Sequence, residues 1–266
     1  MAMNRIIVIT SGKGGVGKTT CTANLGMALA KSGKRVVVID ADFGLRNLDL
    51  LLGLENRIVY TALDVLAGEC RLDQALVKDK RQPNLALLPA AQNRSKESIT
   101  PDQMKKLVRA LTKAYNFVLI DSPAGIEMGF RNAIAAAREA IIVTTPEISA
   151  VRDAVRVIGL LEANDVKAMR LVINRLKPAM VEAQQMMSVK DVQDILAVPL
   201  LGVIPDDEQV VVSTNNGEPL ILDKELSQAG TAVSNIARRL QGEKVPLMDL
   251  SVPKDSFFTK LRRLFD

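Results

Sequence analysis

The chain contains no histidine and no tryptophan, and aromatic residues make up only 3% of its 266 residues. The absence of histidine excludes histidine general bases, histidine metal ligands and histidine pH switches. Only two cysteines are present, Cys21 and Cys70, and they do not form a metal-ligand spacing. We therefore expect no disulfide framework, and we expect the protein to occupy a reducing compartment.

Long apolar segments are also missing. No apolar run reaches the roughly 18 residues that a transmembrane helix needs. The first apolar run leads directly into a glycine-rich loop, so we interpret it as a core strand and not as a signal peptide. The net charge is a mild +5, and 48% of the residues are hydrophobic, which is enough for a sizeable aliphatic core. We expect a soluble protein of the cytosol or of an equivalent organelle interior.

The most informative segment is the glycine-rich loop GKGGVGKTT, which matches the P-loop pattern G-x-x-x-x-G-K-[ST]. It follows a β-branched apolar run, 5–10, and precedes a helical pattern, 18–31. Strand, glycine loop and helix N-terminus together form a phosphate site, because backbone N–H groups and the helix dipole point toward the anion. The predicted nucleotide-binding residues of the loop are Gly12, Lys13, Gly14, Gly15, Val16, Gly17, Lys18, Thr19 and Thr20.

Strand-like and helical patterns alternate along the rest of the chain. This alternation predicts an α/β fold with a doubly wound, mostly parallel sheet of about seven or eight strands and helices on both faces. The expected strands are 5–10, 35–40, 84–88, 116–121, 140–145, 169–174 and 199–204, and the expected helices are 18–31, 101–114, 130–137, 149–163, 188–196 and 224–241. We predict an ATPase domain at 1–242, a linker at 243–253 and a terminal amphipathic helix at 254–266.

Aspartates follow two of the predicted strands. Asp121 follows four apolar residues, which is the Walker B arrangement, while Asp40 ends another strand and Asp42 lies two residues further on. The carboxyl ends of parallel strands meet at one edge of a sheet, so we expect these carboxylates beside the P-loop. Phosphoryl transfer needs a metal and a positioned water, and Lys18 would reach the β- and γ-phosphates. Thr19 and Asp121 are predicted to hold Mg²⁺, with Asp40 and Asp42 close by.

Several motifs resemble those of the ParA/MinD family of deviant Walker A ATPases. They are KGGVGKTT at 13–20, DADFGLRNLD at 40–49, DSPAG at 121–125, ExSxVRD at 147–153 and LGVIP at 201–205. The resemblance covers essentially the whole chain, and the second motif and the C-terminus resemble the MinD branch of the family.

The resemblance implies roles for individual residues. Lys13 is the signature lysine, which would face the partner's phosphates in a nucleotide-sandwich dimer, and Asp42 would orient the attacking water. Lys13, Lys18 and Asp42 are thus the expected catalytic residues. Asp40 would join Asp121 in supporting Mg²⁺. Asn174 holds the family's adenine-reading position, Pro205 and Asp206 fall in the loop that would line the base, and Arg175 is expected among the nucleotide-binding residues.

The C-terminal segment 254–266 has an amphipathic pattern. At about 100° per residue, its apolar side chains fall within one arc of roughly 120°. A basic amphipathic helix of this kind is typical of membrane-surface anchors, whereas docking on the protein's own core is the alternative. The predicted membrane-binding residues are Phe257, Phe258, Leu261, Leu264, Phe265, Lys260, Arg262 and Arg263.

By resemblance, ATP and Mg²⁺ would hold a homodimer that binds anionic membrane, recruits a MinC-like division inhibitor and responds to a MinE-like activator. The protein would be cytoplasmic and peripheral on the inner face of the cell membrane, or in the plastid stroma, and would position the division site. The predicted helix at 149–163 is a candidate partner surface. No specific nucleic acid is expected.

The sequence is also compatible with other functions. A ParA-like DNA-partitioning ATPase would need a basic patch on the folded body, and a flagellar-number regulator of the same family is harder to exclude. An ATP-gated adaptor with little turnover and a small-molecule kinase are further alternatives. An iron–sulfur reductase of the wider family is disfavoured, because no cysteine follows Cys70.

Overall fold

The computed structural model describes residues 4–43, 46–91 and 99–250. Eight strands form one sheet in the order β3-β4-β2-β5-β1-β6-β7-β8. Neighbouring strands run parallel except β3, which pairs antiparallel with β4 at the sheet edge. The strands are β1 Arg5–Thr10, β2 Val36–Asp40, β3 Val77–Lys78, β4 Leu85–Leu88, β5 Phe117–Asp121, β6 Glu139–Thr144, β7 Ala168–Leu176 and β8 Leu200–Pro205.

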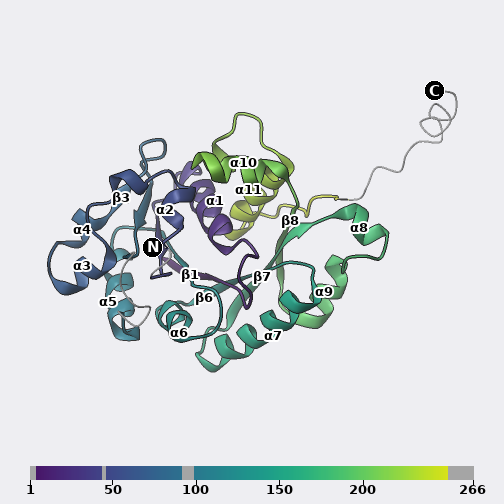
Figure 1. The fold of residues 1–266 in the computed structure, drawn as a ribbon, viewed down its shortest axis with the longest axis horizontal. Coiled ribbons are helices and arrows are strands. Elements are labelled where there is room, and N and C mark those ends of the chain that lie inside the picture. Colours follow the sequence, from purple (N-terminus) through teal and green to yellow (C-terminus); the bar gives the residue numbers. More distant parts are fainter. Residues whose placement is uncertain (1–3, 44–45, 92–98, 251–266) are drawn as a thin grey trace.

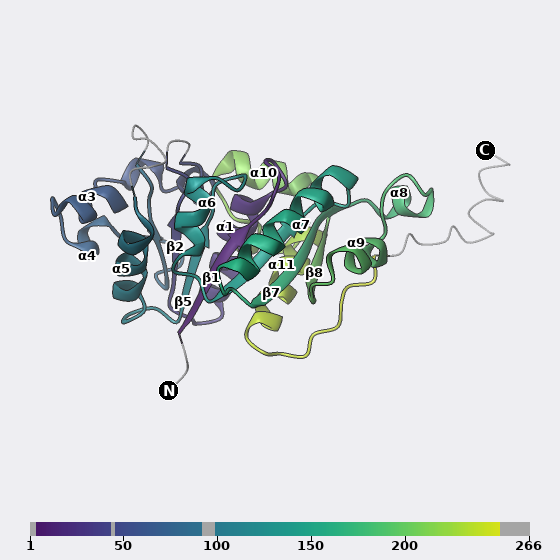
Figure 2. The same ribbon diagram turned by 90° about the horizontal axis from the view of Figure 1, so that it is seen from below.

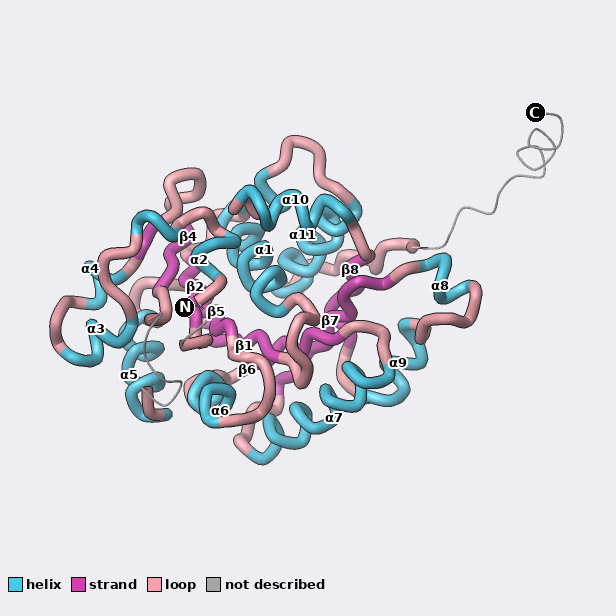
Figure 3. Tube along the Cα trace, in the orientation of Figure 1, coloured by secondary structure: helices cyan, strands magenta, loops and turns pink. Residues whose placement is uncertain are grey.

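Helices cover both faces of this sheet (Figures 1 and 3). One face carries α1 Lys18–Lys31, α2 Leu48–Leu51 and α11 Gln228–Leu240, and the other carries α5 Pro101–Leu111, α6 Met128–Ile134, α7 Ile148–Ala163 and α9 Val189–Leu196. Figure 2 shows α6 and α7 in front of the strands. The remaining α-helices are α3 Ala62–Ala67, α4 Leu72–Ala75, α8 Pro178–Glu182 and α10 Glu208–Asn216, with 3₁₀ turns at Glu55–Arg57 and Leu220–Leu222.

Strand β1 shows why helices pack on both faces of the sheet. Ile6 and Val8 belong to one core cluster, whereas Ile7 and Ile9 belong to the other. Alternate side chains of a strand point to opposite faces, so an uninterrupted apolar strand is buried on both sides. The central position of β1, between β5 and β6, places the loop that follows it at the middle of the sheet's carboxyl edge.

The predicted fold class is confirmed, and α1 and β1 have the predicted bounds. All other predicted elements are present, with ends shifted by one to four residues; the helix predicted at 101–114, for example, ends at Leu111. Strand β3 and the helices α2, α3, α4, α8 and α10 were not predicted. Among the described residues, no helix combines the length and apolarity that crossing a bilayer requires.

The division into three segments remains a prediction. Residues 243–250 of the proposed linker form neither helix nor strand. Residues 251–266 lie outside the described part of the chain, and with them the predicted membrane-binding residues Phe257, Phe258, Lys260, Leu261, Arg262, Arg263, Leu264 and Phe265.

Candidate nucleotide site

The loop between β1 and α1 has the geometry of a phosphate site. Gly17 caps the N-terminus of α1 with a φ of 97°, and a Cβ atom at this position would lie 2.3 Å from Asn174 Nδ2. The left-handed backbone and the close approach both require glycine. The Asn174 amide donates a hydrogen bond of 2.8 Å to the carbonyl of Val16, which ties the end of β7 to the loop. The first residues of α1 line an open cleft, and the N-terminal end of a helix favours an anion.

Lys18 and Asp121 lie together behind the loop, and both are almost fully buried. Asp121 Oδ1 accepts a hydrogen bond of 2.9 Å from the hydroxyl of Thr22. Burial raises the pKa of Asp121 to about 6, although hydrogen bonds from Thr19 and Thr22 and the charge of Lys18 oppose the shift. Burial also lowers the pKa of Lys18, against the attraction of nearby carboxylates.

Asp40 faces Asp121 across neighbouring strands, because the two residues are partners in the register of β2 and β5. Its carboxylate accepts backbone hydrogen bonds from Asp42 at 2.9 Å and from Leu48 at 3.2 Å. Burial first, and then repulsion from Asp121, raise the pKa of Asp40 to about 7. Asp40 and Asp121 are thus two buried carboxylates on adjacent strands. A cation bound between them would stabilise their ionised forms.

The oxygen atoms of Thr19, Asp40 and Asp121 are ligands of the kind that Mg²⁺ prefers. The described residues contain no cluster of three or more His, Cys, Asp or Glu side chains able to hold a metal. Mg²⁺ commonly takes one or two carboxylates and completes its shell with waters and substrate phosphates. The Thr19 hydroxyl and the carboxylates of Asp40 and Asp121 fit that pattern, so these three residues would hold the ion.

A cleft of about 770 Å³ adjoins the loop on this side, which we call the phosphate-side cleft. Asp42 lines it together with the loop residues Gly14, Gly15, Gly17, Lys18, Thr19 and Thr20. Asp42 therefore borders the same space as the loop residues predicted to bind phosphate.

A second cleft, of about 1240 Å³, adjoins the other side of the loop, and we call it the base-side cleft. The predicted nucleotide-binding residues Asn174, Arg175, Pro205 and Asp206 all line it. Asp206 is also paired with Lys177 at 3.2 Å. The two clefts share Gly17, Thr20 and Arg175, so they adjoin each other at the P-loop, and we call the two together the nucleotide channel.

Arg175 reaches both clefts because β7 is irregular at this point. The register between β7 and β8 shifts between Asn174 and Leu176, and Arg175 has a φ of 59°. A bulge of this kind re-aims a side chain, and it often lies next to a functional site. Arg175, which was predicted to bind the nucleotide, thus lines both clefts.

Lys13 lies at the surface of the loop. Its ammonium is 3.2 Å from Glu147 Oε2 and 3.0 Å from Ser149 Oγ, both at the start of α7. The side chains of Lys13 and Glu147 are 40% and 56% exposed, so the pair is well hydrated. Neither Glu147 nor Ser149 was predicted to contact the loop.

Further lining residues were also missed by the sequence analysis. Thr22 supports Asp121 from one turn inside α1, which an i+3 spacing from Thr19 could have indicated. Met180, Met186 and Met187 line the base-side cleft, and no local pattern distinguishes them from core methionines. Asn47, Ser122 and the end of α10 line the phosphate-side cleft.

Comparisons with known proteins agree with this geometry. Residues 7–220 match the family described as the CobQ/CobB/MinD/ParA nucleotide binding domain. The chain is 64% identical over 261 residues to the septum site-determining protein MinD of Synechocystis, with 98% of each chain covered.

Solved structures give the same result. A MinC:MinD cell division protein complex from Aquifex aeolicus is similar with a TM-score of 0.86 and 51% identity, covering 92% of this chain and 98% of that one. MinD from Pyrococcus horikoshii complexed with Mg-ADP has a TM-score of 0.82 and 34% identity, covering 91% and 100%. With the P-loop, the paired carboxylates and these likenesses, the chain belongs to the MinD branch of the CobQ/CobB/MinD/ParA nucleotide-binding family.

Proposed function

We propose that this protein is a Mg²⁺-dependent ATPase that dimerises on ATP, binds anionic membrane as a dimer, and positions the division site. The observation that carries the proposal is the grouping of Lys18, Thr19, Asp40 and Asp121 beside the P-loop: Asp40 pairs with Asp121 across β2 and β5, and Asp121 interacts with Thr19 and Lys18, which line the phosphate-side cleft. The likeness to the MinD bound to Mg-ADP supports a nucleotide with Mg²⁺ in the nucleotide channel.

The phosphates would lie on the N–H groups at the start of α1, with Lys18 beside the β- and γ-phosphates. Bound Mg²⁺ would neutralise the charge that develops on the phosphoryl oxygens. Thr19, Asp40 and Asp121 would hold that ion, and Asp42 would orient a water molecule for in-line attack. Water exclusion strengthens each of these interactions, because charges attract more strongly in a low-dielectric site.

Lys13 would act across a dimer interface. It is exposed in the single chain and paired only with surface groups, and such a pair contributes about 0–1 kcal/mol. The cost of moving Lys13 to a second copy's phosphates is therefore small. Its charge would add to that of Lys18 when the partner supplies it.

The tail at 254–266 would be the membrane anchor. A peptide this short is marginally helical in water, so one tail would bind weakly and reversibly. Two tails on one dimer gain through effective concentration, commonly by a factor of 10²–10⁴. ATP-driven dimerisation would thus recruit the protein to the inner face of the membrane, and hydrolysis would release it.

The partners of the membrane-bound dimer would be a MinC-like inhibitor and a MinE-like activator. The similar Aquifex structure is a complex with MinC, which supports the first of these. The side of α7 that faces away from the sheet is a candidate contact surface, with Arg152, Val155 and Arg156 exposed on it.

Co-sedimentation with anionic liposomes tests the proposal most directly. The protein should pellet with ATP and Mg²⁺, remain in solution with ADP and Mg²⁺, and remain there in both cases when residues 254–266 are deleted. Equal pelleting with both nucleotides would make the tail a constitutive anchor. Failure to pellet with either would remove the membrane role and return DNA partitioning to consideration, to be tested next by DNA binding.

A further inference from the structure

The ends of two short helices line the phosphate-side cleft together with the P-loop. Leu50, Leu51 and Gly53 come from the end of α2, and Thr214–Gly217 come from the end of α10. Neither segment was predicted to belong to the site. The two ends are far apart in the sequence but lie against each other in the fold.

The two ends meet backbone to backbone. Gly53 and Gly217 have φ values of 61° and 63°, and a Cβ on Gly53 would lie 2.7 Å from the Gly217 carbonyl oxygen. A Cβ on Gly217 would lie 2.9 Å from the Cα of Gly53. Glycine is therefore required on both sides of the contact. The carbonyl oxygens of Leu50 and Gly217 lie at this contact, and a nearby cation would offset their partial negative charge.

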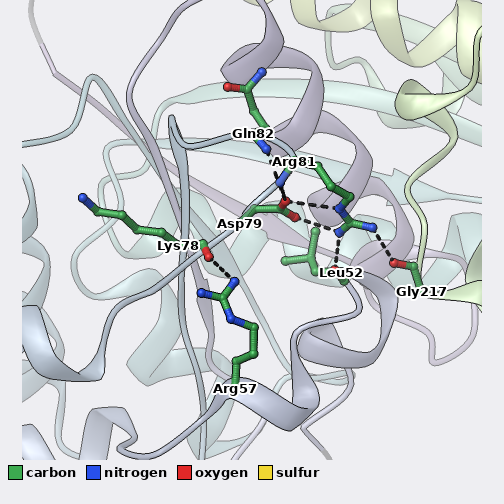
Figure 4. A network of polar contacts seen from close by, with 7 residues as sticks. All are labelled: Leu52, Arg57, Lys78, Asp79, Arg81, Gln82 and Gly217. Atoms are coloured by element: carbon green, nitrogen blue, oxygen red, sulfur yellow. Dashed lines mark hydrogen bonds and ion pairs between the residues drawn. The ribbon is translucent and has the colours of Figure 1, made fainter.

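Arg81 supplies that cation (Figure 4). Its guanidinium donates one hydrogen bond to the carbonyl of Leu52, at the end of α2, and another of 3.2 Å to the carbonyl of Gly217, at the end of α10. One planar group thus ties both helix ends together. Arginine suits this role better than lysine, because its donors form a fixed fork that can reach two acceptors at once.

Asp79 fixes the position of Arg81. The Asp79 carboxylate, whose side chain is 0% exposed, receives Arg81 Nε at 3.2 Å and Nη2 at 2.8 Å. Backbone N–H groups of Arg81 and Gln82 also donate to it, at 2.7 and 3.3 Å. Burial would raise the pKa of Asp79, but these hydrogen bonds outweigh it and hold the pKa below its ordinary value. The guanidinium is therefore held in one orientation from the loop between β3 and β4.

The opposite end of α2 is attached to the candidate metal site. The N–H of Leu48, the first residue of α2, donates to Asp40 Oδ2 at 3.2 Å. A helix of four residues therefore joins Asp40 to Leu52, and Arg81 joins Leu52 to Gly217. This chain of contacts is continuous from the predicted Mg²⁺ ligands to the end of α10.

We propose that Arg81 is a positioning residue of the nucleotide site, which locks the ends of α2 and α10 into one wall of the phosphate-side cleft. The wall then responds as a unit when nucleotide and metal bind beside Asp40. The inference rests on the proposed nucleotide function. It adds that order at Thr214–Gly217 depends on a side chain in the β3–β4 loop that does not itself line the cleft.

Hydrogen exchange with and without Mg-ADP tests this role in the full chain. In the wild type, Mg-ADP should slow exchange both at residues 12–22 and at residues 208–217. In Arg81→Gln, protection at 12–22 should persist, protection at 208–217 should be lost, and the affinity for Mg-ADP should fall by about tenfold. Arg81→Lys, which keeps the charge but not the fork, should restore part of the affinity.

Two further variants separate positioning from folding. Arg81→Gln leaves the buried Asp79 carboxylate unpaired and lowers Tm, so the double variant Arg81→Gln/Asp79→Asn should regain Tm without regaining protection at 208–217. Arg57→Gln is the matched control, since Arg57 donates at 2.6 Å to the Lys78 carbonyl in the same region and does not line the cleft (Figure 4). It should behave as the wild type.

The possible results are distinct. Wild-type protection at 12–22 without protection at 208–217, or unchanged protection and affinity in Arg81→Gln, would overturn the positioning role alone. An equal loss in Arg57→Gln would also overturn it, because the effect would then be general loosening of the loop. Absence of any Mg-ADP protection in the wild type would overturn the proposed nucleotide function and this inference with it.

Discussion

The ammonium of Lys13 lies 3.2 Å from the carboxylate of Glu147, which links the P-loop to the N-terminal end of α7 within one chain. Ser149 Oγ accepts from the same ammonium at 3.0 Å. The signature lysine is therefore already engaged before a second copy is present. Dimerisation as proposed has to exchange this intramolecular pair for an intermolecular one.

Replacing Glu147 should make that exchange easier. Glu147→Gln removes the charge of the pair in both subunits. We therefore expect ATP-dependent dimers to form with up to about 30-fold higher affinity, since a dimer gives up two exposed pairs and each contributes no more than about 1 kcal/mol. Sedimentation velocity with ATP and Mg²⁺ measures the change. Glu162→Gln, an exposed position on the same helix, is the control. Weaker dimerisation in Glu147→Gln would instead mean that Glu147 holds Lys13 in its productive position.

Lys18→Ala should abolish ATP-dependent dimerisation and hydrolysis. The substitution removes the cation beside Asp121 and leaves that buried carboxylate without the attraction of Lys18. We expect turnover to fall by at least about 10²-fold, the usual effect of removing one preorganised group that stabilises charge. A phosphate-release assay with liposomes present measures this. Normal turnover in the variant would refute the assignment of the P-loop.

Asp42→Ala should separate binding from chemistry. Asp42 lines the phosphate-side cleft but is not among the residues proposed to hold the metal. We expect ATP binding and dimerisation to persist while turnover falls by about 10²–10⁴-fold, the range for a positioned base. Asp42→Asn, which keeps the shape, should lose turnover as well. If either variant failed to bind ATP, the role of Asp42 would be structural.

Much of the fold was predictable because local signals agreed with it. The helix at 18–31 follows a glycine loop and the buried strands are uninterrupted apolar runs, so both have the predicted positions. Helix α10 was missed because it contains three consecutive valines, of which Val211 and Val212 are exposed. Its caps were present in the sequence, since Asp207 accepts from the Gln209 N–H and Gly217 ends the helix in a left-handed conformation.

The site was predictable only where one segment carries it. The P-loop and the strand-end aspartates are local patterns, and the structure brings them together as expected. The partners Lys13 and Glu147 are 134 residues apart, and Arg81 and Gly217 are 136 apart. Such contacts depend on how the sheet is wound and on where loops end. Periodicity within a single segment contains no information about them.

The stability of the protein without nucleotide should fall as pH rises from about 5 to 8. The pKa values of Asp40 and Asp121, about 7 and about 6, lie above the ordinary value of 3.8. The folded protein therefore holds these protons more tightly than the unfolded chain does. The resulting stabilisation is complete below about pH 4 and is lost as pH rises through 6 and 7.

Thermal unfolding in EDTA at a series of pH values measures this slope, and Asp40→Asn is the decisive comparison. The amide of Asp40→Asn cannot ionise, so the Tm of this variant should decrease much less between pH 5 and 8 than the Tm of the wild type. The decrease that remains would come from the ionisation of Asp121. Saturating Mg-ADP should flatten the slope in the wild type, because a bound cation favours the ionised carboxylates. Identical slopes in wild type and Asp40→Asn would show that Asp40 is already ionised in the free protein. In that case water would screen the repulsion between the two negative charges of Asp40 and Asp121, and neither carboxylate would need to be protonated.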